Sequence, residues 1–142
     1  MITNERQYRI TKTEIERFEK SLSQPAGQEE DLHPELQVAM REGLESQLQE
    51  LREEIEEYDA LRSGKVTSFE FNTLADVPIG LIKARIARGL TQKQLADSLH
   101  LKEQQIQRYE STLYEGAGLT RIQEVADLLG LHESVKLEIS ES

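Results

Sequence analysis

The sequence contains no cysteine and no tryptophan, and only three histidines among its 142 residues. Without cysteine there can be no disulfide, no thiolate metal site and no cysteine nucleophile. His33, His100 and His132 are more than thirty residues apart, which is not the spacing of metal ligands, so we expect neither a metal nor another cofactor. There is also no phosphate-binding loop and no histidine paired with a carboxylate at catalytic spacing, so nothing favours an enzyme.

Aromatic residues make up 5% of the chain and hydrophobic residues 37%. This composition cannot easily supply the core of a large β-sandwich or barrel, so we expect a mostly α protein. No run approaches the roughly 18 to 20 apolar residues of a membrane span, and Met1 to Ile10 has no apolar stretch that could act as a signal peptide. We therefore expect a cytoplasmic protein without a membrane partner.

The formal net charge is −10, but the charge is unevenly distributed. Residues 1–66 carry nine basic and sixteen acidic side chains, and residues 67–142 carry eight and eleven. Within the second region, residues 81–108 have six basic side chains against two acidic ones, a local net charge of +4. Binding to a polyanion depends on one face and not on the whole-chain average, so the acidic total does not exclude nucleic acid.

Region 1–66 has the pattern of two helices. The first is predicted over 13–22, and a linker with Pro25, Gly27 and an acidic run follows at 25–31. The second helix is predicted to start at Pro34, run to about Leu61 and stop before Gly64. Its apolar residues are spaced 4, 3, 4 and 3 apart, as in the a/d seam of a coiled coil; they are Leu44, Leu48, Leu51, Ile55 and Tyr58.

A seam this narrow needs a partner helix. One partner is the same helix of a second chain, which would make region 1–66 an acidic dimerisation or partner-binding module, and we favour this interpretation. The alternative is a helical hairpin within one chain, which is supported by the shortness of the seam and by Gly43 near its start.

Region 67–142 is predicted to hold a helical domain flanked by two short strands. The strands are suggested by alternating apolar and polar residues at 66–74 and again at 135–139. We expect the two strands to pair with each other, within or between chains, because unpaired strand edges are a liability in a small protein.

Helix signals are dense between Pro78 and Leu131. Gly89 is predicted to end the first helix in a left-handed conformation, and Thr91 with Gln94 forms a capping box that starts the second. A turn of three or four residues at His100 leads to a third helix, and the small Ala96 allows the two helices to cross closely. A further helix is predicted from about Leu119 to Leu129, ended by Gly130. Two short helices joined in this way form a helix-turn-helix.

The segments LTQKQLA (90–96) and LKEQQIQRYE (101–110) resemble the Cro/C1-type repressor family, also called the XRE family. The resemblance covers roughly residues 79–131 and implies a lambda-repressor-like bundle that binds double-stranded DNA. It implies that the recognition helix is about Glu103 to Tyr109, that Gln92 holds a phosphate, and that Arg85 and Glu110 form a structural ion pair.

On the recognition helix, the exposed positions have side chains suited to base edges. Glutamine can pair with adenine, arginine with guanine, and glutamate can accept from the cytosine amino group; these residues are Glu103, Gln104, Gln107 and Arg108. Basic side chains around the helix are expected to contact phosphates; they are Lys83, Arg88, Lys93 and Lys102. The loop after the helix has no basic residue, so the hydroxyls of Ser111, Thr112 and Tyr114 are expected to contact the DNA backbone instead.

The sequence also departs from the family at two positions. His100 stands where these repressors usually turn on glycine, and Lys102 replaces the usual serine or threonine cap. The predicted function is sequence-specific repression by a homodimer that binds an inverted-repeat operator, including that of its own operon. The alternative is an antitoxin or adaptor that neutralises a partner toxin with little or no DNA binding, since the architecture also resembles antitoxins of bacterial toxin–antitoxin operons.

Overall fold

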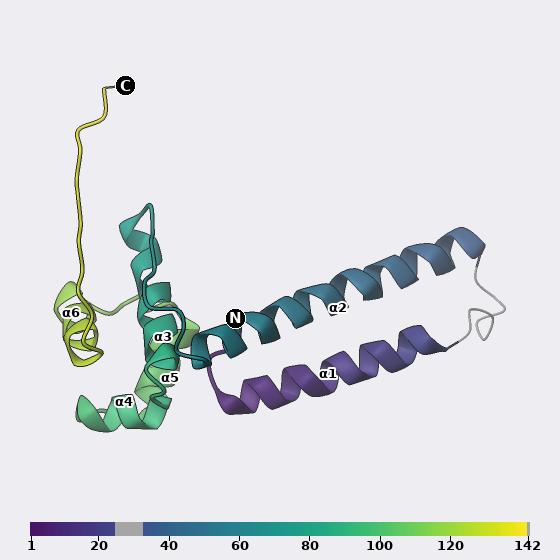
Figure 1. Ribbon diagram of the computed structural model, residues 1–142, viewed down its shortest axis with the longest axis horizontal. Helices are drawn as coiled ribbons and strands as arrows, with labels where there is room; N and C mark the ends of the chain where they lie inside the picture. Colours follow the sequence, from purple (N-terminus) through teal and green to yellow (C-terminus); the bar gives the residue numbers. More distant parts are fainter. Residues whose placement is uncertain (25–32, 142) are drawn as a thin grey trace. The chain divides into compact units, whose positions relative to one another are not determined.

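The computed structural model describes residues 1–24 and 33–141. The chain divides into two compact units, Met1–Thr67 and Ser68–Ser142, and is mostly α-helical as predicted (Figure 1). The linker predicted at 25–31 lies outside the described residues. No helix of the described part is long and apolar enough to cross a membrane.

The first unit is an antiparallel hairpin of two helices, α1 (Glu5–Ser23) and α2 (Pro34–Arg62). The predicted bounds of α2 are confirmed, with Pro34 in its first turn. In contrast, α1 starts eight residues earlier than predicted. The side chain of Asn4 caps it by accepting a hydrogen bond from the Gln7 backbone N–H, at 2.8 Å, and the Gln7 side chain accepts from the Thr3 N–H, also at 2.8 Å.

The seam of α2 has a partner within the same chain. Leu48 and Tyr58 are buried, and the other three seam residues are half-buried. Contacts to α1 run along the hairpin: the Tyr8 hydroxyl donates to Asp59 at 2.9 Å, and Arg52 pairs with Glu19 at 2.9 Å. The helix that covers the seam in this structure is therefore α1, which corresponds to the hairpin alternative.

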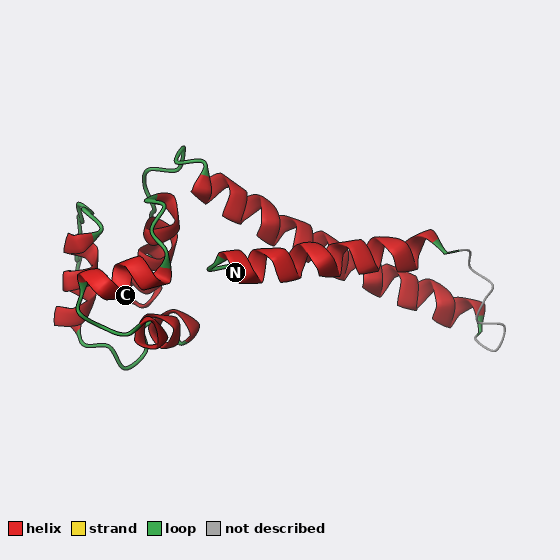
Figure 2. Ribbon diagram, turned by 90° about the horizontal axis from the view of Figure 1, so that it is seen from below, coloured by secondary structure: helices red, strands yellow, loops and turns green. Residues whose placement is uncertain are grey.

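Both predicted strands are wrong, because the described residues contain no strand (Figure 2). Residues 66–73 form no regular secondary structure, and the Phe71 ring packs against Gly80. A Cβ placed on Gly80 would lie 2.7 Å from the Phe71 ring, so only glycine allows this close approach. The alternation at 66–74 thus reflects side chains that pack on a helix instead of a strand ladder.

The second predicted strand, residues 135–139, is an extended tail. Its apolar residues Val135, Leu137 and Ile139 are exposed, and Lys136 pairs with Glu138 at 2.8 Å. Residues 1–24 and 33–141 include no neighbouring strand to accept its backbone hydrogen bonds, so the alternating pattern alone does not produce a sheet.

The second unit is a bundle of four helices. After a short 3-10 turn, η1 (Leu74–Asp76), come α3 (Val77–Ala87), α4 (Gln92–Ser98), α5 (Glu103–Ser111) and α6 (Leu119–Leu128), close to the predicted bounds. Each helix contributes apolar side chains to one core; those almost fully buried are Ile82, Leu95, Ala96, Ile106, Val125 and Leu129. The predicted stop at Gly89 and the capping box of Thr91 and Gln94 are both present.

Candidate nucleic-acid interface

The turn between α4 and α5 brings the two helices into close contact. Ala96 has no exposed surface, and its carbonyl accepts a hydrogen bond from the Leu101 N–H at 2.8 Å. His100, which stands where the family usually has glycine, adopts a left-handed conformation with a φ of 58°. The pair α4–α5 therefore has the geometry of a helix-turn-helix.

The N-terminus of α5 is capped in a way that the sequence analysis missed. The side chain of Gln105 accepts a hydrogen bond from the Lys102 backbone N–H at 3.0 Å. The same arrangement occurs in α4, where Gln94 accepts from the Thr91 N–H at 2.9 Å. In both helices a glutamine follows the N-cap residue by three positions, and this spacing could have been recognised in the sequence. The glutamine explains how α5 starts without a serine or threonine cap.

The outward face of α5 is polar and open to solvent. Gln104, Gln107 and Arg108 are exposed, whereas Ile106 and Glu110 are buried. Glu103, also exposed, is the first residue of the helix. All four residues predicted to read bases are thus exposed on one helix of nine residues, and the amide and guanidinium groups share the side that faces away from the core.

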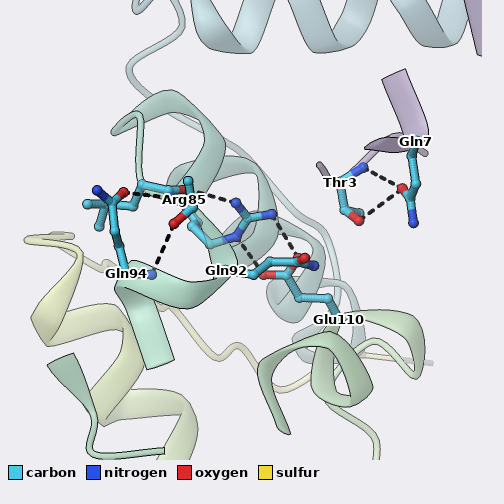
Figure 3. A network of polar contacts seen from close by, with 8 residues as sticks. Thr3, Gln7, Arg85, Gln92, Gln94 and Glu110 are labelled. Atoms are coloured by element: carbon cyan, nitrogen blue, oxygen red, sulfur yellow. Dashed lines mark hydrogen bonds and ion pairs between the residues drawn. The ribbon is translucent and has the colours of Figure 1, made fainter. Parts of the chain in front are cut away.

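Behind this face, a buried polar network joins three helices (Figure 3). From α3, the Arg85 guanidinium donates twice to the Glu110 carboxylate of α5, at 2.6 and 2.8 Å, and once to the Leu90 carbonyl at 2.8 Å. From α4, the Gln92 amide donates to the same carboxylate at 2.9 Å. The charged side chains are only 3% and 1% exposed. The ion pair implied by the family resemblance is therefore present, with Gln92 as a third member.

This network gives Gln92 a different role from the predicted one. The resemblance implied that its side chain holds a phosphate, but the side chain is buried and its amide donates to a carboxylate of the core. A buried carboxylate needs hydrogen-bond donors for its remaining lone pairs, and Gln92 supplies one. In this structure Gln92 helps to position α5.

Arg88 also has a structural role. Its guanidinium donates to the Leu129 carbonyl at 2.8 Å and to the Gly130 carbonyl at 3.2 Å, both just beyond the end of α6. Free carbonyls at a helix C-terminus attract cations, so this side chain connects the ends of α3 and α6. The residue is exposed, and its predicted phosphate contact stays a prediction.

The other predicted phosphate contacts differ in their availability. Lys93 and Lys102 are exposed, whereas Lys83 is half-buried. The hydroxyls of Ser111 and Thr112 donate to the Arg108 carbonyl, at 3.0 and 2.8 Å, so their protons are used within α5. Lys93 and Lys102 are therefore the two predicted cations that are exposed and whose side chains are not used in the bonds described above.

The loop after α5 contains an unusual buried tyrosine. Tyr114, which was expected to contact the DNA backbone, is 2% exposed and stacks on Tyr109 with ring centroids 5.2 Å apart. Its hydroxyl has no hydrogen-bond partner in the described part of the chain, and burial raises the pKa of this phenol well above its ordinary value. Leu113 and Tyr114 both have positive φ, so the loop turns sharply to bring this ring inside.

No group of three or more His, Asp and Glu side chains within residues 1–24 and 33–141 is placed to hold a metal ion.

Comparison with known proteins agrees with this geometry. Residues 81–135, which span α3 to the start of the C-terminal tail, match the family model HTH_3, described as helix-turn-helix. The chain has no significant match among curated proteins or among solved structures. The helix pair, the buried ion pair and the family match together identify this segment as a DNA-binding helix-turn-helix domain of the Cro/C1 (XRE) type, the type found in transcriptional regulators.

Proposed function

We propose that the chain is a sequence-specific transcriptional repressor that inserts α5 into the major groove of DNA. The observation that carries this proposal is the contrast between the two sides of α5. One side is fixed by the buried Arg85–Glu110 pair, and the other exposes Gln104, Gln107 and Arg108. A rigid helix with exposed amide and guanidinium groups suits direct reading of base edges.

The contacts divide by chemistry. The base-reading residues are Glu103, Gln104, Gln107 and Arg108, with Arg108 suited to guanine and the glutamines to adenine. Lys93 and Lys102, exposed near the starts of α4 and α5, would contact phosphates, because an ammonium on a flexible chain supplies charge without sequence information. This is a smaller phosphate set than the sequence predicted.

A single helix of nine residues makes few base contacts, so we propose that the protein binds as a homodimer to an inverted repeat. Half-sites about one helical turn, ~34 Å, apart are the simplest arrangement. Since α1 covers the seam of α2, the dimer contact would lie on another surface. Repression of its own operon fits such a regulator.

A role as the antitoxin of a toxin pair rests on the family resemblance and on the acidic residues of α2, which would suit a basic partner protein. An interaction-only protein has no comparable support, because the polar face of α5 is exposed and its supporting network is complete.

Selection of bound duplexes from a random pool tests the proposal. We expect enrichment of one palindromic sequence, and gel shifts that are much weaker on a scrambled duplex. Light scattering should give about twice 16.3 kDa. Failure to enrich any sequence would overturn sequence-specific binding, and an enriched single half-site with a monomer mass would overturn the dimer.

A further inference from the structure

The outward face of α1 carries four positive charges and no negative one. Arg6, Arg9, Arg17 and Lys20, with Thr13 between them, fall within a sector of about 100° around the helix axis, opposite the side that packs on α2. We call these five residues the cationic face of α1. All five are exposed.

These four cations differ from the other arginines of the hairpin. Arg41, Arg52 and Arg62 each pair with a glutamate of the same hairpin. Within the described residues, no ion pair is present for the four cations of the cationic face. Exposed cations without an ion pair in the described part of the hairpin are available to an external anion.

The hairpin is electrically polarised. The outward face of α2 carries Glu42, Glu53 and Glu56, all exposed, and the corresponding sector of that helix has no basic residue. An acidic helix turned toward DNA would be repelled, whereas the cationic face would be attracted. The charge distribution therefore allows only one side of the hairpin to approach a polyanion.

The dimensions of the cationic face suit the DNA backbone. From Arg6 to Lys20 the helix rises about 21 Å. Duplex DNA presents one negative charge per roughly 1.7 Å of its axis, so a face of this length can meet several phosphates. Three of the four cations are arginines, whose planar guanidinium can bind phosphate oxygens with two hydrogen bonds.

The short covalent connection between the hairpin and the second unit also favours DNA as the ligand of the cationic face. Arg62, at the end of α2, forms an ion pair with Glu5 at the start of α1, so the chain leaves the hairpin at the end where the cationic face begins. The unit that contains the helix-turn-helix starts at Ser68, only six residues later. When α5 occupies a groove, the short tether keeps the cationic face at high effective concentration near the flanking backbone.

We propose that the cationic face of α1 is a second DNA-binding site that contacts the phosphate backbone without reading its sequence. The proposal rests on the proposed DNA-binding function, and it assigns to the acidic N-terminal unit a direct part in binding. Affinity for any duplex then comes from both units, whereas base preference comes from α5 alone.

The test compares variants of the full chain on a random-sequence duplex several helical turns long, over a range of salt concentrations. Arg9→Gln/Arg17→Gln removes two cations from the face, so the slope of log affinity against log salt should fall by about two, and the loss of affinity between 50 and 200 mM salt should shrink roughly tenfold. Arg9→Lys/Arg17→Lys keeps the charge and should keep most of the slope. Arg41→Gln/Arg52→Gln removes two cations from α2 and should leave the slope unchanged.

Two results with the arginine variants would overturn the proposal. One is an unchanged slope for Arg9→Gln/Arg17→Gln while Gln104→Ala and Arg108→Ala lose specific binding; the proposed function would then stand without a second site. The other is weaker binding that comes only with a change from dimer to monomer in light scattering.

Ile10 lies beside the cationic face and is 49% exposed, so a protein partner would use it. Ile10→Gln should therefore not alter DNA binding, and a loss equal to that of the arginine variants would indicate a protein contact instead.

Discussion

Arg85 and Glu110 lie 25 residues apart in the sequence and form two hydrogen bonds in the interior of the second unit. Arg85 belongs to α3 and Glu110 to the last turn of α5, so the pair fixes the orientation of α5 relative to the bundle. A buried ion pair adds little net stability compared with apolar side chains, but each partner is costly without the other. Its main contribution is therefore the defined position of α5.

Removing one partner should destabilise the fold strongly. Glu110→Ala leaves the Arg85 guanidinium buried without its carboxylate, and we expect the free energy of unfolding to fall by about 3–5 kcal/mol. The double variant Arg85→Met/Glu110→Leu should lose much less than the sum of the single variants. Urea denaturation measures all three, and additive losses would show that the pair is not energetically coupled.

The two sides of α5 should respond differently to truncation. Gln104→Ala and Arg108→Ala change exposed side chains, so stability should change by less than about 0.5 kcal/mol while specific binding weakens by about 1–3 kcal/mol. Ile106→Ala should instead cost about 2–5 kcal/mol of stability through the cavity it leaves. Thermal melts and gel shifts on the selected and scrambled duplexes separate the effects. Unchanged binding of Gln104→Ala and Arg108→Ala would mean that α5 is not the reader.

Arg88 and Lys93 were both predicted from the sequence to bind phosphate, but in the structure Arg88 donates to carbonyls of the protein whereas Lys93 is exposed. Arg88→Ala removes hydrogen bonds to two carbonyls beyond α6 and should lower stability by about 1 kcal/mol. Lys93→Ala should leave stability unchanged and lower the salt slope of binding by about one. A comparison of urea midpoints and salt titrations checks this, and the reverse assignment of effects would contradict it.

Tyr114 should make stability depend on pH in the alkaline range. Burial raises the pKa of its phenol, so above a pH of about 10 the unfolded chain loses this proton while the folded chain keeps it. Folding stability therefore falls as pH rises past that value, since the folded state binds more protons. Tyr114→Phe removes this contribution.

The comparison of parent and Tyr114→Phe isolates one group from the other tyrosines and lysines that titrate nearby. At neutral pH the variant should equal the parent or exceed it by up to about 1 kcal/mol, because it removes a buried hydroxyl without a partner. Its advantage should grow as pH rises above 10 in urea titrations. A constant difference between pH 7 and 11 would mean that the hydroxyl is solvated in solution.

The helical parts of the fold could be predicted because their signals are local. Helix type and bounds are specified by periodic apolar residues, by Gly89, by the capping box at Thr91 and by Pro34 in the first turn of α2, without knowledge of the partner surfaces. The start of α1 was missed because Thr11 occupies a buried position, which hid the apolar stripe that connects Tyr8 to Ile15. The strands were wrong because a period of two is also produced by an extended segment, and a sheet requires a partner that local sequence does not specify.

The role of a single polar residue could be predicted only where it does not depend on whether the side chain faces the protein interior or the solvent. Arg88, Gln92 and Lys93 are equally polar in the sequence, and only the packing of α3, α4 and α6 shows that two of them turn toward carbonyls or a carboxylate of the protein. For the same reason, the spacing of the seam in α2 left its partner open. The apolar spacing predicts that a helix covers the seam, but it does not indicate which chain supplies that helix.

The separation of the two sides of α5 also bears on how such a protein can change its target. The exposed side chains Gln104, Gln107 and Arg108 contribute little to folding, so substitutions there can alter base preference with small penalties in stability. The buried network differs in this respect, since almost any substitution of Arg85 or Glu110 should destabilise the whole domain. Under the proposed function, a new operator specificity would thus be accessible through single, independent substitutions on a scaffold that remains the same.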